Sequence, residues 1–204
     1  MAGIVFAGLL GVSMVLIQSA VPTSRIYDPS WLVEEKTSIS VAIALVPFAA
    51  IAFLWFMGVL RTQFGEMEDR FFATVFLGSG LLFLASLFMW IGLLSATVVT
   101  AGAIPTWERG DAFPFAATLI KVMGSSIMLR MAGVFVFSTS TIWLRAKLMP
   151  RWVAYLSMAL ALLMLVGGES IRALRLIFPA WVLLVSILIL IRERRRSGDG
   201  EHRQ

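Results

Sequence analysis

The stretch that decides the fold runs from Lys121 to Arg145 and reads KVMGSSIMLRMAGVFVFSTSTIWLR. Between its charged ends, Arg130 is the only charged residue. At a rise of about 1.5 Å per residue, this length spans a hydrocarbon core of about 30 Å. An arginine inside such a segment costs roughly 2.5 to 3.5 kcal/mol on insertion scales, and it usually faces a bundle interior or a watery cavity. The stretch therefore predicts a membrane helix with a polar side that faces other helices.

The composition of the whole chain agrees with this prediction. The 204 residues are 59% hydrophobic and 14% charged, with a mean hydropathy of +0.90, whereas soluble domains carry about 25% charged residues. Several apolar runs also reach membrane length, so the sequence predicts an all-α, polytopic membrane bundle in contact with lipid. The net charge of +5 gathers at helix ends and in the tail. Topology and anionic lipid explain that placement, and no nucleic-acid partner is predicted.

Two missing residue types limit the chemistry. The sequence has no cysteine, which excludes disulfides, thiol catalysis and thiolate metal sites. Its only histidine, His202, lies in the polar tail, so the bundle cannot supply the usual ligands of a buried haem or a histidine-rich zinc site. We therefore predict no metal site and no cofactor.

The apolar runs predict six transmembrane helices in one domain, residues 1–191. Their expected ranges are 4–21, 38–60, 71–94, 121–144, 152–168 and 176–191. The last two runs are slightly short of a full span. Residues 192–204 are polar and rich in arginine, which predicts a disordered basic tail.

The first run could instead be a cleaved signal peptide. No Lys or Arg precedes it, and Gln18-Ser19-Ala20 is a poor cleavage pattern, so a retained helix is favoured. Gly3, Ala7 and Gly11 recur there at every fourth residue, which lets another helix approach closely. This small-residue face predicts contact with another membrane protein or with a second copy of the chain.

The longest connector, residues 95–120, is not plainly hydrophilic. It contains Pro105, Trp107, Asp111 and Pro114, and it fits an interfacial or partly re-entrant segment, a lid over the bundle mouth, or a loose loop. Connectors of this length are often functional or flexible. We therefore expect substrate or partner contact here.

Positive charge predicts the orientation in the membrane. With six spans and an inside N-terminus, connectors 61–70 and 145–151 and the tail lie inside. The basic residues on that side are Arg61, Arg70, Arg145, Lys147, Arg151, Arg192, Arg194, Arg195, Arg196 and Arg203. The other side holds Arg25, Lys36, Arg109, Arg172 and Arg175. This bias predicts a multi-pass plasma-membrane protein with both termini in the cytoplasm.

One polar site can be proposed from spacing alone. Ser126, Arg130, Gly133, Phe137 and Ser140 recur at spacings of four and three residues, which places them on one helix face. Lys121 falls on the opposite side of the helix and can extend toward the interface. We therefore expect a polar interior stripe with Arg130 at its centre.

An intramembrane arginine needs a partner at the same depth. Counting residues along regular helices places Glu169 near the level of Arg130. The first hypothesis is an Arg130–Glu169 ion pair, with Arg172 as competitor and Ser126 as auxiliary acceptor. The alternative pairs Glu169 locally with Arg172, three residues on. Arg130 would then bond serine hydroxyls, helix-end carbonyls or water.

Two further features indicate structural roles. Pro47 removes a backbone donor inside the second predicted helix and kinks it. The hydroxyl run from Ser138 to Thr141 is expected to bond to carbonyls of the preceding turn. A nucleophilic serine would need a nearby base, and no such group is placed there.

Three stretches carry a resemblance to known proteins: GEMEDRFFATVFLGSGLLFLA (65–85), FSTSTIWLR (137–145) and FPAWVLLVSI (178–187). They resemble a group of multi-pass membrane proteins of high-GC Gram-positive bacteria to which no activity is assigned. The resemblance implies a bacterial cell membrane and does not indicate a reaction.

Three functions fit these features. The first is a non-catalytic accessory or structural bundle that acts through partner helices, which the small-residue face favours. The second is a small transporter or channel-like protein in which Arg130 binds an anionic or polar solute. The third is a membrane enzyme that acts on lipid, which the absence of a catalytic pair disfavours. We favour the first function, without catalysis.

Overall fold

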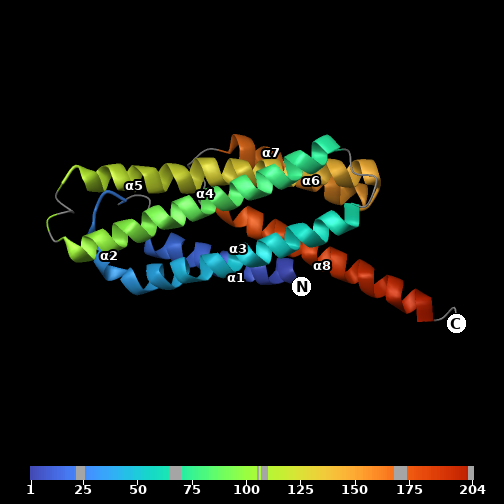
Figure 1. The fold of residues 1–204 in the computed structure, drawn as a ribbon, viewed down its shortest axis with the longest axis horizontal. Coiled ribbons are helices and arrows are strands. Elements are labelled where there is room, and N and C mark those ends of the chain that lie inside the picture. Colours follow the sequence, from blue (N-terminus) through green and yellow to red (C-terminus); the bar gives the residue numbers. More distant parts are fainter. Residues whose placement is uncertain (22–25, 65–69, 105, 107–109, 168–173, 202–204) are drawn as a thin grey trace.

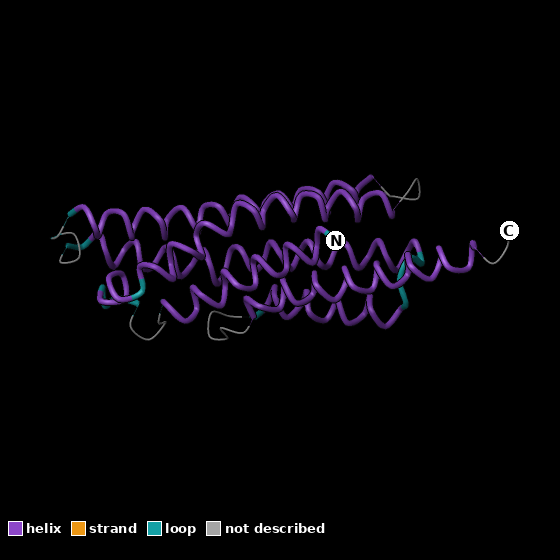
Figure 2. The backbone as a smooth tube through the Cα atoms, turned by 90° about the horizontal axis from the view of Figure 1, so that it is seen from below, coloured by secondary structure: helices purple, strands orange, loops and turns teal. Residues whose placement is uncertain are grey.

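The computed structural model is helical throughout its regular structure. It describes residues 1–21, 26–64, 70–104, 106, 110–167 and 174–201. Within these ranges there is no strand, and the helices run along one long axis (Figure 1). The tube in Figure 2 shows the same elongated bundle from a second side. The all-α prediction is therefore confirmed for the described residues.

Most of the described chain belongs to eight α-helices and one π-helix. These are α1 (Ala2–Ala20), α2 (Ser30–Glu34), α3 (Lys36–Phe64), α4 (Arg70–Ala103), α5 (Ala112–Val122), the π-helix (Met123–Ile127), α6 (Met128–Ala146), α7 (Arg151–Val166) and α8 (Leu174–Glu201). By length and composition, five segments could cross a membrane: Ala2–Ala20, Lys36–Gln63, Phe71–Ala103, Ala112–Ala146 and Leu174–Arg192. Helix α7 is apolar but has only 16 residues.

Two predicted segments differ in the structure. The expected connector 95–120 is largely helical, since α4 continues to Ala103 and α5 begins at Ala112. A loose loop is therefore wrong for its described residues. Helix α8 extends to Glu201, so residues 192–201 are helical where disorder was predicted. In both places an existing helix adds residues without a new nucleation cost. In residues 192–201, arginine and glutamate are also good helix formers.

The helices pack in two connected groups. Helix α1 lies against α3 and α8, and α6 contacts both α4 and α7. The Ser13 hydroxyl of α1 donates to the Ala42 carbonyl of α3 at 2.9 Å. That carbonyl lies next to Ile43, whose carbonyl loses its helical donor because Pro47 has no N–H. The hydrogen bond therefore joins two helices close to the proline inside α3.

Aromatic rings fill the centre of the bundle. The ring centroid of Phe53 lies 4.8 Å from that of Phe6, 5.3 Å from Phe83, 5.2 Å from Phe135 and 5.7 Å from Phe178. These five rings come from α1, α3, α4, α6 and α8. Van der Waals packing drives helix association in lipid, and each aromatic pair adds about 0.5–1.5 kcal/mol. The rings therefore tie the two groups of helices together.

The hydroxyl run of α6 bonds as predicted. Ser138 and Thr139 donate to the Phe135 carbonyl at 3.0 and 2.8 Å. Ser140 and Thr141 donate to carbonyls four residues earlier, at 2.6 and 2.9 Å. These contacts confirm the structural role of the run, because they satisfy the hydroxyl donors inside their own helix.

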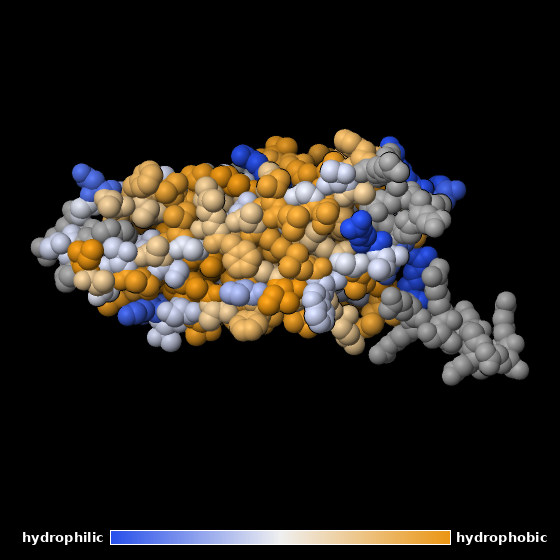
Figure 3. Space-filling view, viewed as in Figure 1, coloured by the Kyte–Doolittle hydropathy of each residue, from blue (hydrophilic) through white to orange (hydrophobic). Residues whose placement is uncertain are grey.

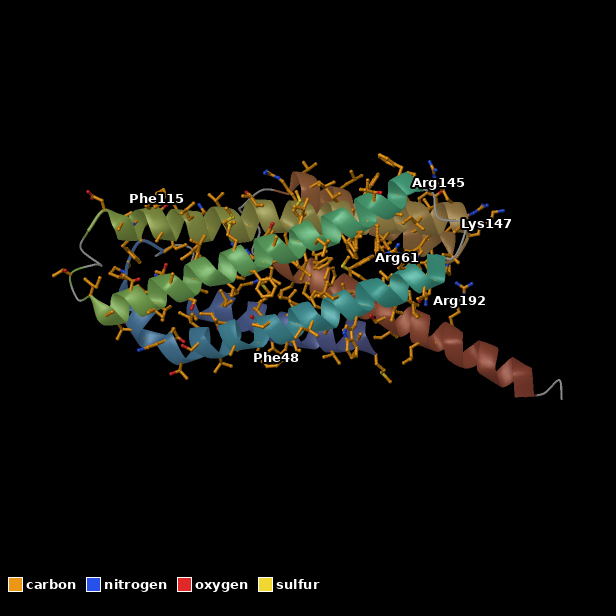
Figure 4. The ribbon with its side chains drawn as sticks, in the orientation of Figure 1. Phe48, Arg61, Phe115, Arg145, Lys147 and Arg192 are labelled. Atoms are coloured by element: carbon orange, nitrogen blue, oxygen red, sulfur yellow. The ribbon has the colours of Figure 1, made fainter. Side chains whose placement is uncertain are left out.

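The surface separates apolar sides from a basic end. Apolar residues cover most of the face shown in Figure 3. Figure 4 shows Arg61, Arg145, Lys147 and Arg192 together at one end, while Phe115 lies toward the other. Such broad exposed apolar surfaces are rare on soluble monomers and suit contact with lipid.

Candidate functional site

Arg130 lies on the exposed surface of α6. The prediction that it faces the bundle interior is therefore wrong. The buried side of α6 consists largely of apolar side chains: Met128, Leu129, Ala132, Phe135, Val136, Ile142 and Trp143. Packing of this stripe against α4 and α7 turns the arginine outward. In the described part of the chain, no hydrogen bond or ion pair involves Arg130.

The other residues of the predicted stripe are divided. Gly133 is buried against α7, where an added Cβ would lie 3.1 Å from the Ala161 carbonyl oxygen. Ser140 is buried, Phe137 is exposed and Ser126 is half-buried. A face defined by residue type thus differs from the face that packing selects.

The described structure does not test the ion pair proposed for Arg130. Glu169 and Arg172 lie outside the described residues. The Arg130–Glu169 pair and the local Glu169–Arg172 pair both stay predictions. The paired site suggested by the sequence is therefore not tested by the described residues.

A different polar site lies where α1 ends and α8 begins. A small cavity of about 20 Å³ is lined by Ile17, Trp90, Ile120, Lys121 and Arg175, among other residues. Both basic side chains are half-buried. Four segments thus bring two cations to one enclosed place. We call Trp90, Lys121 and Arg175 the basic cluster.

A π-helix packs against Trp90 of the basic cluster. It covers Met123–Ile127 and follows Lys121 directly. A Cβ on Gly124 would lie 2.5 Å from the Trp90 indole nitrogen, so only glycine lets the ring approach this closely. The Ser125 hydroxyl donates to the Lys121 carbonyl at 2.6 Å. Single π-turns of this kind are often found at functional sites.

The indole N–H of Trp90 is a buried donor. The side chain is 1% exposed, and Nε1 finds no hydrogen-bond partner in the part of the chain that the structure describes. Such a donor typically costs about 1–3 kcal/mol when it stays unpaired. Together with the nearby cations, this indole donor favours the binding of a water molecule or a small anion in the cavity. A cavity of this size holds about one water, so an organic solute does not fit.

Sequence reasoning missed the basic cluster for a specific reason. Lys121 was expected to extend to the interface, and Arg175 was assigned to a connector. Neither residue is close in sequence to Trp90, so spacing alone does not bring the three together. The available signal was the MGSSI segment after Lys121, whose small residues permit close packing against an aromatic ring.

The small-residue face of α1 also turns inward. An added Cβ on Gly3 would collide with the Ser186 hydroxyl of α8 and lie 2.7 Å from the Phe56 ring. Ala7 is buried, and Gly11 is half-buried. Part of this face therefore packs within the chain. Its predicted role in contact with a partner is not tested by this packing.

In the described ranges, no group of three or more His, Asp or Glu side chains could hold a metal ion. No protein-family model matches the chain, and neither a curated protein nor a solved structure matches it. The resemblance to membrane proteins of high-GC Gram-positive bacteria therefore stays a prediction.

Proposed function

We propose that the chain is a multi-pass protein of the bacterial cell membrane and acts as a non-catalytic accessory or structural bundle through contact with partner helices. It has six membrane segments in this proposal, with α7 as the short one, and both termini are cytoplasmic. Five segments of spanning length and one shared basic end support this arrangement.

The observation that carries the proposal is the aromatic centre. Five helices contribute one ring each to this centre, Phe53 and its four neighbours, and every one of these rings is buried. A transporter of organic solutes needs a water-accessible site near mid-membrane. A centre filled by rings favours a protein that acts through its outer surface instead.

The outer surface has an apolar groove that suits a partner helix. The α1–α3 groove measures about 590 Å³ and is lined by Met1, Ala2, Val5, Leu9, Phe48, Ile51, Ala52 and Trp55. Phe48 and Trp55 are 63% and 71% exposed, and Phe48 points away from the bundle in Figure 4. Small residues between exposed large ones let a second membrane helix approach closely. The proposed occupant is α1 of a second copy.

Cross-linking in native membranes tests this contact. The chain has no cysteine, so Val5→Cys introduces its only thiol. We expect a thiol-specific cross-linker to join two copies at position 5. Val15→Cys is the matched control, because Val15 is exposed to the same extent on the same helix but does not line the groove. Absence of a product at position 5, or equal products at both positions, would contradict the proposed contact between two copies at this groove.

A second candidate function is the handling of a small anion. The basic cluster supports it through two cations and a buried indole donor. Chloride flux into vesicles that contain the protein distinguishes the two functions. The accessory bundle predicts flux equal to that of protein-free vesicles. Flux that Lys121→Met abolishes and Lys147→Met leaves unchanged would establish anion handling instead.

A further inference from the structure

We propose that the turn between α6 and α7, together with α8, forms a binding site for the headgroup of an anionic phospholipid. The pocket measures about 470 Å³ and is lined by Lys147, Leu148, Met149, Pro150, Leu188, Ile191 and Arg192. This inference rests on the membrane insertion in the proposed function and not on the accessory role.

The position of the pocket matches the level of lipid headgroups. Lys147 follows directly after the end of α6 at Ala146, and Arg192 ends the apolar segment that begins at Leu174. Both residues lie at the basic end shown in Figure 4. Two helices thus leave the apolar layer at the point where their cations lie.

The chemistry of the pocket has two parts. Lys147 and Arg192 are exposed cations, and no acidic partner for either is found among the described residues. The other lining residues are apolar, and Leu188 and Ile191 precede Arg192 on α8. A phosphodiester would bind the cations while its acyl chain lies along the apolar wall. Basic pockets between membrane helices bind anionic lipid in this way.

The backbone at Lys147 supports a role in binding. Its φ of 52° and ψ of 32° place it in the left-handed region, where glycine or asparagine is usual after a helix. Among the described residues it is the only non-glycine with positive φ. Backbone strain of this kind gathers at ligand sites. A lysine here places a cation at the pocket without lengthening α6.

The source of the phosphate can be tested separately. Inorganic phosphate and glycerol phosphate carry the anionic phosphate group of the headgroup but have no acyl chains. If the apolar wall contributes, neither ion competes with lipid at matched concentration. Full displacement by either ion would assign the pocket to a soluble anion and overturn the lipid proposal.

The main experiment uses the full chain in phosphatidylcholine nanodiscs with increasing fractions of phosphatidylglycerol. Native mass spectrometry counts the retained phosphatidylglycerol. We expect Arg192→Gln and Lys147→Gly each to lower its apparent affinity about fivefold. Arg61→Gln is the matched control, because Arg61 is exposed at the same end but does not line the pocket.

Lys147→Gly also separates loss of lipid binding from loss of folding. Glycine removes the charge and suits the left-handed backbone, so this variant should be at least as thermally stable as the parent in phosphatidylcholine alone. A similar loss of phosphatidylglycerol in Arg61→Gln would show diffuse attraction to a basic surface and overturn the site. The same conclusion follows if the parent retains phosphatidylglycerol no better than phosphatidylcholine.

Discussion

At the scale of single residues, packing decides which side chains form a site. Arg130 is the only charged residue between Lys121 and Arg145, yet its side chain is exposed. Lys121 and Arg175 lie at the ends of apolar runs in the sequence, and they line one cavity with Trp90. Residue type could be read from the sequence, whereas burial depends on contacts between helices that are distant in the chain.

Gly124 provides a direct test of this packing. We expect Gly124→Ala to destabilise the protein by about 1–3 kcal/mol, because the added Cβ would lie 2.5 Å from Trp90 Nε1 and force the ring to move. Thermal unfolding in detergent measures the change. Gly78→Ala is the control, since no atom lies within 4 Å of its added Cβ. Equal stability of the two variants would show that the ring does not rest on the π-helix.

Arg130 provides the second test at this scale. Because the side chain is exposed, Arg130→Leu should not lower thermal stability in detergent. Its transfer into lipid should become more favourable by a few kcal/mol, since a charge is removed. A large loss of stability would indicate an internal partner. In that case the cycle of Arg130→Ala, Glu169→Ala and the double variant would show whether the pair couples.

At the scale of helices, the different lengths of α4 and α1 predict where the hydrocarbon core of the membrane ends. Helix α4 has 34 residues and measures about 51 Å, whereas α1 has 19 and measures about 28 Å. The end of α1 and the start of α8 lie level with Trp90 and Lys121, because all four line one cavity. We therefore predict that the hydrocarbon core ends near this level and that residues 95–103 and 112–120 extend beyond it.

A labelling experiment checks this extension. Val99→Cys and Phe115→Cys should react with a membrane-impermeant maleimide added outside intact cells, because both positions are exposed and lie past the proposed boundary. Leu81→Cys is exposed on the same α4 but lies in its membrane part, so it should stay unlabelled. Protection of all three positions would place the extension in lipid.

Some helices could be predicted from the sequence and others could not. Apolar runs of the sequence coincide with the central part of each long helix, because hydrophobic length is a local property. They did not predict α2 or the helices within 95–120, since those segments mix apolar and polar residues. The π-helix at Met123–Ile127 was also missed, because the ring of Trp90 on another helix accompanies it.

At the scale of the whole molecule, the fold class and the basic end could be predicted. Both follow from composition and from the placement of Lys and Arg, which need no knowledge of tertiary contacts. The aromatic centre could not be predicted, since it joins rings from five helices. From this centre we propose a closed bundle without a pathway for organic solutes.

The most direct test of that closed centre is the reactivity of single thiols in native membranes. Ala132→Cys and Ser79→Cys place small thiols at positions that are 1% and 4% exposed, and Lys147→Cys is the accessible control. We predict that a small water-soluble thiol reagent modifies position 147 and leaves positions 132 and 79 unmodified until the protein is denatured. Modification of the two buried thiols at the rate of position 147 would reveal a water-filled path and contradict a closed centre of the bundle.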